Sequence, residues 1–369
     1  MATVTRRPAA GSRLSTGAIG WGLLLFLTAI GLTWGIRSNT CPSNLGAWVG
    51  FGVTGFRLGC IYAMIALGYT MVYGVLQLLN FAHSEVFMVG SFAGLYALKS
   101  LFGISGRSHP LGVGGFELVA VLVVGLLLAA LASGATAVAM ERVAYRPLRR
   151  RGASRLTYLI TAIGVSLFLS NLFLLLDGKK HLGLPFNWPN IGGPAPINYP
   201  QPMHRGKVFS IVGVPVDNIT ILVILVAIGM LIVLDLFVRR TRAGKGIRAV
   251  AEDPETASLM GVNINGIIVL TFFVGGLMAG VAGLLYGMFF SFAQFNMGFI
   301  PGIKAFTAAV LGGIGNIRGA MLGGIMLGMI ENLGVACTGA QWQSVIAFVV
   351  LVGVLMVRPT GILGEQVGG

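Results

Sequence analysis

Residues of the types that usually form catalytic or metal sites are sparse and scattered in this chain. The four histidines lie far apart, and neither an HExxH nor a CxxC pattern occurs. Cys41, Cys60 and Cys337 show no paired spacing, so neither a disulfide framework nor a metal site is expected. No GxxxxGK[ST] phosphate-binding loop occurs, so ATP binding by that route is not expected. The sequence predicts no catalytic residue, no cofactor and no metal in this chain.

The side chains that could do chemistry are instead polar groups set within long apolar stretches. A charged group inside a membrane is costly unless it faces a cavity or a partner, and the candidates are Glu85, Lys304, Arg318 and Glu331. One polar cluster spans Asn80 to Glu85, and a second interruption surrounds Asn316. Paired interruptions in the two halves of a transporter indicate a central binding site. The candidates for a substrate path are Asn80, His83, Ser84, Glu85, Thr307, Asn316 and Arg318.

The first cluster allows two arrangements. Either the helix after it extends past Lys99 and the cluster is a solvated cytoplasmic turn, or the helix is broken and the cluster lies at membrane depth. With a solvated turn, Arg318 merely pairs with a carboxylate to hold two helices. We favour membrane depth because the apolar run from Val86 to Leu98 is short for a span. Glu85 is then expected to be oriented by backbone amides or by Arg318 rather than to carry protons.

Composition places the elements that position these residues in a membrane. Hydrophobic residues make up 56% and charged residues 10% of the 369 residues, and the mean hydropathy is +0.88. Soluble domains carry about 25% charged residues. The sequence therefore predicts an all-α polytopic membrane protein. A single transmembrane domain over 1–369 is expected to hold about eight or nine helices, broken or re-entrant near 79–86 and 303–319.

The basic residues indicate the orientation. Fourteen of the 25 fall in three stretches, Arg6 to Arg13, Arg142 to Arg155 and Arg239 to Arg248. This clustering follows the positive-inside rule, so these stretches and the N-terminus are assigned to the cytoplasm. A nucleic-acid function would require a folded basic domain, and none is evident. By parity the proline-rich segment at about 177–216 lies outside, and its apolar, β-branched end predicts a small hairpin.

Hydropathy also gives the limits of the spans. The run from Gly17 to Ile36 is interpreted as an uncleaved first helix, and the second is expected to start near Leu58 with Arg57 at the outer boundary. Counting Ile303 to Leu333 as one crossing leaves the C-terminus outside, whereas a re-entrant pair, which we favour, returns it to the cytoplasm. Close helix packing is predicted for two rows of small residues: Gly276, Gly280, Gly283 and Gly287, and Gly319, Gly323, Gly324 and Gly328.

The polar insert at about 239–263 contains a short helix with clear ends. Asp253 can cap it, Pro254 suits its first position, and Gly261 is expected to end it. A helix of about two turns is not stable alone in water, so it needs a surface on which to dock. The residues expected at that surface are Glu252, Asp253, Pro254, Ala257, Leu259, Met260 and Gly261.

Three stretches, spread from about Thr54 to Leu333, resemble the permease subunit of branched-chain amino-acid ABC importers. They are ALGYTMVYGVLQLLNFAHSEVFMVGS, then ERVAYRPLRR with LTYLITAIGVSLFLSN, and AVAEDPETASLMGVN with KAFTAAVLGGIGNIRGAMLGG. Ser84 stands where the family usually has glycine. The resemblance implies a subunit of the bacterial inner membrane that pairs with a second related permease, two ATPases and an extracytoplasmic binding protein. It also implies that the insert at 239–263 is the coupling loop for the ATPase.

The expected function is that of the non-enzymatic permease subunit of an ATP-driven importer of branched-chain or other neutral amino acids. Relatives that carry urea or short amides leave those substrates open. Two other mechanisms stay open as well. One is an ion-coupled secondary transporter in which Glu85 or Glu331 carries protons, and the other is a passive channel with the glycine-rich breaks as its filter. An ion-coupled carrier would move substrate alone on a proton or sodium gradient, and a permease subunit would not.

Overall fold

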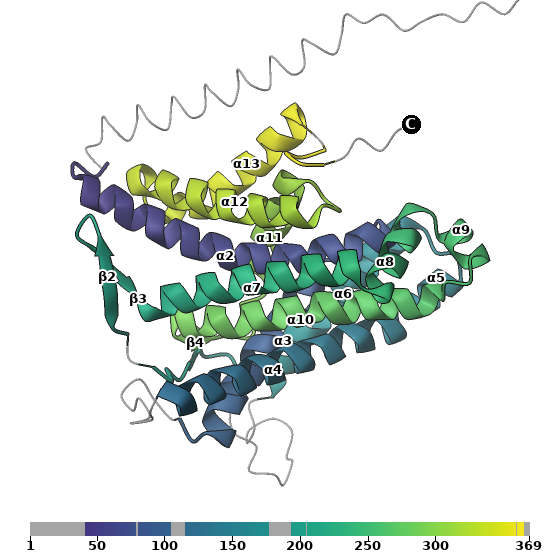
Figure 1. Cartoon of the computed structure of the whole chain (residues 1–369), viewed down its shortest axis with the longest axis horizontal. Helices are drawn as coiled ribbons and strands as arrows, with labels where there is room; N and C mark the ends of the chain where they lie inside the picture. Colours follow the sequence, from purple (N-terminus) through teal and green to yellow (C-terminus); the bar gives the residue numbers. More distant parts are fainter. Residues whose placement is uncertain are drawn as a thin grey trace, which may run out of the picture.

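The computed structural model describes residues 41–78, 80–104, 115–176, 193–203, 205–358 and 360–364, and most of them are helical. Figure 1 shows the long helices running side by side. The helices are α2 (Leu45–Leu76), α3 (His83–Tyr96), η1 (Ala97–Leu101), α4 (Gly115–Met140), η2 (Glu141–Tyr145), α5 (Arg146–Arg150), α6 (Arg155–Leu175), α7 (Asn218–Arg240), α8 (Arg242–Glu252), α9 (Pro254–Leu259), α10 (Ile264–Phe290), α11 (Phe299–Gly312), α12 (Ile317–Thr338), η3 (Ala340–Trp342) and α13 (Gln343–Val357). The predicted all-α fold is confirmed.

The lengths of these helices fit a multi-pass membrane protein. Within the described ranges, seven helical stretches are long and apolar enough to cross a membrane: Leu45–Leu76, Gly115–Arg150, Arg155–Leu175, Asn218–Arg240, Ile264–Phe290, Ile317–Thr338 and Ala340–Val357. α11 has 14 residues. At a rise of about 1.5 Å per residue it is shorter than a hydrocarbon core of about 30 Å. α3 continues into the π-helix η1, which carries it past Lys99. The predicted first helix, Gly17 to Ile36, lies outside the described residues.

The bundle has two distinct ends (Figure 1). At one end lies the hairpin of β2 (Lys207–Ile211) and β3 (Val214–Asp217), which pair antiparallel as predicted. At the other end lie α5, α8 and α9, which carry basic residues of the second and third stretches. A second small pairing, of β1 (Ile197–Asn198) with β4 (Phe292–Ala293), follows α10. The hairpin and the basic residues are therefore separated by the length of the bundle.

A disulfide at the hairpin end corrects an expectation from the sequence. Cys41 and Cys337 are bonded across 296 residues of chain, with their Cα atoms 4.2 Å apart. The expectation of no disulfide was wrong because α2 and α12 pack along their length and bring the start of one helix to the end of the other. Sequence spacing cannot reveal a pairing that packing creates. Cys60 is buried and free.

The glycine rows allow helices to pack backbone to backbone. A Cβ added to Gly324 would lie 2.5 Å from backbone atoms of Ala63, so α12 rests directly on α2. A Cβ added to Gly283 would lie 2.2 Å from the carbonyl oxygen of Phe87, so α10 approaches α3 in the same way. No side chain fits at these contacts. The predicted packing role of the rows is confirmed.

The start of α2 differs from the prediction. The helix begins at Leu45, not near Leu58, and Arg57 therefore lies within it rather than at its boundary. The guanidinium of Arg57 pairs with Asp217 at 3.1 Å and lies 3.8 Å from the ring centroid of Phe289. Because its charge is neutralised in this way, the helix continues through it.

The C-terminal segment lies at the end that carries the basic residues. The backbone N–H of Leu363 donates to the carbonyl of Gly312 at the end of α11 (3.0 Å). One residue into α12, Arg318 pairs with Asp235 of α7, which also pairs with Arg239. This position of the C-terminal segment agrees with the alternative in which Ile303 to Leu333 form a re-entrant pair, here α11 and α12, rather than a single crossing.

Candidate functional site

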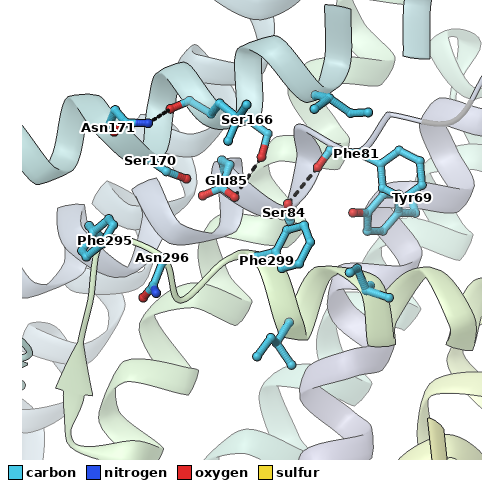
Figure 2. A pocket seen from close by; sticks show the side chains of 14 residues that line it. Tyr69, Phe81, Ser84, Glu85, Ser166, Ser170, Asn171, Phe295, Asn296 and Phe299 are labelled. Carbon is cyan, nitrogen blue, oxygen red and sulfur yellow. Dashed lines mark hydrogen bonds between the residues drawn. The ribbon is translucent and has the colours of Figure 1, made fainter. Parts of the chain in front are cut away.

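A cavity of about 690 Å³ lies between α3, α6 and the start of α11 (Figure 2). Its volume falls within the range of small-molecule sites, roughly 300–1,000 Å³. Most of its wall is apolar, formed by Tyr69, Phe81, Ile163, Leu167, Phe295, Phe299, Ile300 and Ile303. The polar lining is confined to Ser84, Glu85, Ser166, Ser170, Asn171 and Asn296. A small solute with an apolar body and a polar head would match this lining.

α6 places the cavity near the middle of a candidate membrane span. Ser166 lies about midway along the helix, which runs from Arg155 to Leu175. Ser170 follows one turn later, so both hydroxyls lie on the same face of α6. Polar groups at this depth are costly unless they face a cavity. Substrate sites of transporters also lie near the bilayer midplane.

The start of α3 brings the first predicted cluster to the same place. The chain after α2 folds back, so that a Cβ added to Gly68 would lie 2.2 Å from Nε2 of His83. The hydroxyl of Ser84 donates to the carbonyl of Phe81 at 2.8 Å, and Glu85 follows in the first turn of α3. Glu85 is only 1% exposed. The cluster is buried and is not a solvated turn.

Only one oxygen of the Glu85 carboxylate has a partner. Oε1 accepts a hydrogen bond from the hydroxyl of Ser166 at 3.1 Å, and Figure 2 shows the two side chains meeting. Oε2 is buried and has no hydrogen-bond partner among the described residues. A Cβ added to Gly298 would lie 2.5 Å from the carbonyl oxygen of Ser84 and 2.9 Å from Oε2, so the backbone at Gly298 packs closely against the start of α3.

The protein compensates the charge of Glu85 only in part. The dipole of α3 favours a carboxylate in the first turn by about 0.3–1 kcal/mol, or up to about 2 in buried geometry. A hydrogen bond to a charged group adds about 1.5–3 kcal/mol. The desolvation of a buried ion costs several kcal/mol, even after relaxation. The helix dipole and the hydrogen bond from Ser166 together offset the desolvation free energy of the carboxylate with little or no surplus. Oε2 accepts no further hydrogen bond from the described residues.

Glu331, another intramembrane acid, has a cationic partner, although its Oε1 also lacks a hydrogen bond of good geometry among the described residues. Its Oε1 lies 3.0 Å from Nζ of Lys304, and both side chains are buried. The hydroxyl of Tyr62 and the side-chain amide of Gln343 donate to its Oε2, each at 3.3 Å. This network joins α2, α11, α12 and α13, and none of its members lines the cavity. The geometry gives it a structural role.

Three other path candidates lie behind the cavity wall rather than on it. Asn80 accepts a hydrogen bond from the hydroxyl of Tyr145 at 2.7 Å. His83 packs edge-on against Tyr69, with ring centroids 4.8 Å apart. Thr307 donates to a carbonyl one turn earlier in its own helix. These residues hold the elements around the cavity in place.

Asn316 and Arg318 lie far from Glu85, at the basic end of the bundle. Asn316 caps α12 and its side-chain amide donates to the carbonyl of Leu363. Arg318 pairs with Asp235 at 3.3 Å. The expectation that Arg318 could orient Glu85 was wrong, because Arg318 already has an acidic partner on α7. The break that meets α3 lies instead between α10 and α11, and it includes Asn296 and Gly298.

Sequence reasoning missed four polar residues of the lining: Ser166, Ser170, Asn171 and Asn296. A signal for two of them was present, because Ser166 and Ser170 recur at the i,i+4 spacing in an otherwise apolar helix. The sequence indicated Asn296 less clearly, because its place in the lining depends on how the segment before α11 packs in the folded protein.

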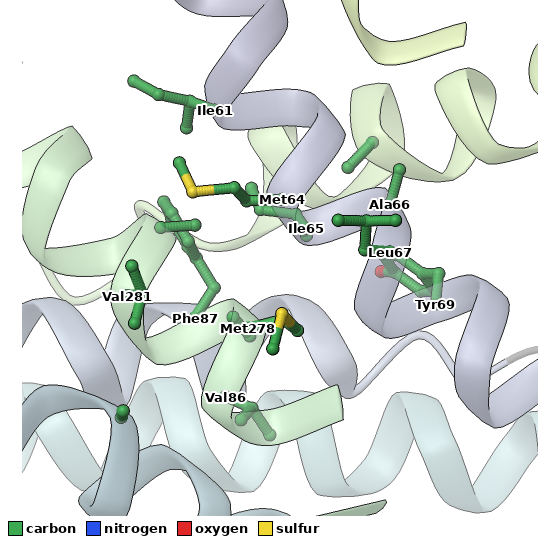
Figure 3. Close-up of a cluster of buried hydrophobic side chains, with 14 of the residues drawn as sticks. Ile61, Met64, Ile65, Ala66, Leu67, Tyr69, Val86, Phe87, Met278 and Val281 are labelled. Atoms are coloured by element: carbon green, nitrogen blue, oxygen red, sulfur yellow. The ribbon is translucent and has the colours of Figure 1, made fainter. Parts of the chain in front are cut away.

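A tightly packed core supports the cavity. Tyr69 belongs both to the wall and to the apolar cluster shown in Figure 3, so one side chain links the two. The cluster brings together α2, α3 and α10 through Ile61, Met64, Ile65, Ala66, Leu67, Val86, Phe87, Met278 and Val281. These residues are nearly inaccessible to solvent. Tightly packed helices therefore support the cavity wall at Tyr69.

The predicted short helix of the polar insert is α9. The Asp253 side chain accepts from the backbone N–H of Glu255 at 2.9 Å and from the hydroxyl of Thr256. The bonds from Thr256, followed by that from Glu255, lower the pKa of Asp253. Gly261 ends the segment with a φ of +81°, which favours glycine.

The apolar residues of α9 divide between the bundle and solvent. Ala257 is buried, whereas Leu259 is 87% and Met260 81% exposed. The sequence analysis did not anticipate α8, the helix that ends at Glu252 directly before Asp253. α8 turns Gly244, Ile247 and Val250 inward. α8 therefore anchors the insert to the bundle. Leu259 and Met260 stay exposed at the tip of the insert.

Comparison with known proteins places this arrangement in a family. Residues 52–355 match the family model described as the permease component of branched-chain amino acid transport systems. The chain belongs to this permease family. It is 41% identical over 315 residues to the high-affinity branched-chain amino acid transport system permease protein BraD of Pseudomonas aeruginosa, covering 85% of this chain and 94% of BraD.

Two further relatives come from other organisms. LivH of Escherichia coli K12, which carries the same description, is 41% identical over 314 residues, covering 84% of this permease and 94% of LivH. A probable branched-chain amino acid transport permease protein LivH of Methanocaldococcus jannaschii is 26% identical over 324 residues, covering 82% and 89%. No solved structure matches the chain significantly. The cavity and the exposed tip of α9 both lie within the matched residues.

Proposed function

We propose that this permease is the transmembrane subunit of an ATP-driven importer that carries branched-chain or other neutral amino acids. The observation that carries the proposal is the cavity beside the middle of α6, whose apolar wall surrounds a small polar group at Glu85 and Ser166. BraD and LivH, which are similar over most of their length, are named for branched-chain amino acid transport. Urea or a short amide has no aliphatic body to contact such a wall.

The proposed energy source lies in partner subunits, since the chain has no phosphate-binding loop. α9 is the proposed contact with an ATPase. Leu259 and Met260 are exposed at the basic end, and a docking groove would remove their apolar surface from water. The contact residues proposed from the sequence were Glu252, Asp253, Pro254, Ala257, Leu259, Met260 and Gly261. Ala257 faces the bundle and would support the helix from behind.

The proposed assembly contains this chain, a second related permease, two ATPases and an extracytoplasmic binding protein. The binding protein would approach the end that carries the β2–β3 hairpin, opposite the basic residues. We place the complex in the bacterial inner membrane, with the N-terminus and the basic stretches in the cytoplasm. No cofactor is proposed for this chain itself.

Reconstitution tests this function against ion-coupled transport and passive flow. The permease is co-expressed with its neighbouring transport genes, and the complex is purified and placed in proteoliposomes. Leucine uptake should require ATP and the binding protein, and a proton or sodium gradient should not replace them. Uptake by this chain alone on such a gradient would contradict the proposal. Equal flow of urea without ATP would support a channel instead.

A further inference from the structure

We propose that Glu85 binds the ammonium group of the amino acid through Oε2, the carboxylate oxygen that accepts no hydrogen bond from the described residues. The inference rests on the proposed function, because it assumes that the cavity carries an amino acid. It gives Glu85 a direct contact with substrate, whereas the sequence alone suggested a structural role.

Glu85 differs from the other buried acids in its lack of a cation. Glu331 pairs with Lys304, and Glu141 pairs with Arg149, both at 3.0 Å. Among the ion pairs of the described residues, none includes Glu85. Its Oε2 is buried and free of hydrogen bonds within the same part of the chain. A cation that enters with the substrate would supply the missing partner.

An ammonium group suits the surroundings of Oε2. It offers three donors and no acceptor, so it needs several oxygens in a small space. Ser170 and Asn296 line the cavity together with Glu85, and Figure 2 shows all three side chains at the same cavity. The backbone of Gly298 packs closely against Ser84 and Glu85 and offers the carboxylate no cation. An ammonium at this place would donate to Oε2 and to neighbouring hydroxyl or amide oxygens.

The remaining lining sets the substrate's orientation. Among the described residues, no lysine, arginine or histidine lines the cavity, so this part of the lining offers no cationic partner to a carboxylate. Ile163, Leu167, Phe299 and Ile300 form an apolar wall that suits an aliphatic side chain. The amino acid would therefore enter with its ammonium toward Glu85 and its side chain along this wall. A compound without an ammonium group would leave Oε2 unpaired.

Competition on the wild-type complex tests this orientation without any variant. Photo-leucine, a leucine analogue with a diazirine in its side chain, is crosslinked to the membrane-embedded permease–ATPase complex without the binding protein. Peptides of α6 and α11 should be labelled. Isopentylamine, which is leucine without its carboxylate, should displace the label. 4-Methylpentanoate, which lacks the ammonium, should need a concentration about tenfold higher or more, because it leaves the buried acid unpaired.

The opposite order of the two competitors would overturn the inference. Equal potency would overturn it as well, because a protonated Glu85 that ignores the ammonium would give that result. Labelling elsewhere in the chain, or none in a complex that imports leucine, would count against the cavity as the binding site.

Variants give an independent readout in the complete importer. Glu85→Gln should lower leucine uptake by about tenfold or more, since it removes one partner of a buried charge pair. Glu85→Asp should restore part of the uptake because it keeps the charge. Glu117→Gln, the same change at an exposed site at the start of α4, is the matched control and should leave uptake unchanged.

The outcomes separate the two proposals. Wild-type complex that imports no leucine with ATP and binding protein would reject the proposed function. Wild-type uptake that is unaffected by Glu85→Gln would reject only the role of Glu85. If Glu85→Gln fails to assemble, the competition on the wild-type complex decides the question.

Discussion

Glu85 on α3 and Gly298 before α11 lie against each other at the cavity, where a Cβ on Gly298 would come within 2.9 Å of Oε2. The same Cβ would lie 2.5 Å from the carbonyl oxygen of Ser84, so we expect Gly298→Ala to shift the start of α3 together with the carboxylate and to lower leucine uptake severalfold. Co-purification of the partner subunits should stay normal. Gly74→Ala is the control, because its nearest neighbouring atom would be 4.0 Å away. Equal uptake in both variants would show that the close contact between Gly298 and the start of α3 is not needed.

The Lys304–Glu331 pair is expected to support the fold rather than transport. Lys304→Met leaves Glu331 buried without a cation, which should destabilise the protein by about 3–5 kcal/mol. The midpoint of thermal unfolding in detergent measures this loss. Adding Glu331→Leu should recover most of the stability, because both charges are then absent. A double variant no more stable than Lys304→Met would argue against this role.

The sequence predicted most of the scaffold correctly. The all-α class, the β2–β3 hairpin and the capped helix after Asp253 all appear in the structure. Each depends on local signals, such as hydropathy, turn residues or a cap. The glycine spacing likewise predicted a close helix contact at Gly324, although the partner, α2, could not be read from it. The first cluster is buried as favoured, but the helix after it extends past Lys99, which the sequence analysis had linked to a solvated turn.

The partners of the site could not be read from the sequence. Ser166 meets Glu85 across 81 residues, and Cys41 meets Cys337 across 296. These contacts depend on how helices pack, and local patterns carry no information about that. Arg318 was assigned to the path because it is a cation in an apolar region. Its partner, Asp235, lies in a different span, and hydropathy alone could not pair them.

The exposed tip of α9 gives a prediction about assembly. Leu259→Glu should place an unpaired charge in the proposed ATPase contact and abolish co-purification of the ATPase. Because Leu259 is 87% exposed, the permease itself should insert and fold normally. Leu259→Met keeps the apolar contact and should retain the ATPase. Normal binding-protein-stimulated ATP hydrolysis in Leu259→Glu would disprove the docking role.

The disulfide gives a prediction about orientation. An impermeant maleimide added to intact cells should label Cys41 and Cys337 only after an external reductant, because both lie at the end with the hairpin. A thiol introduced by Ser154→Cys, at the basic end, should stay unlabelled until the membrane is opened. A mass shift on a gel reports each reaction. Labelling of Ser154→Cys in intact cells, with Cys41 and Cys337 silent after reduction, would reverse the orientation.

Thiol modification of the cavity is the most direct test that it carries the substrate. Of the native thiols, Cys60 is buried and the other two are bonded, so the wild-type protein serves as the unreactive control. Ser170→Cys places a thiol on the cavity wall. A reagent that reacts there should block leucine uptake, and leucine with binding protein and ATP should slow the reaction severalfold. If the modified importer transports normally, or leucine gives no protection, the cavity is not the path.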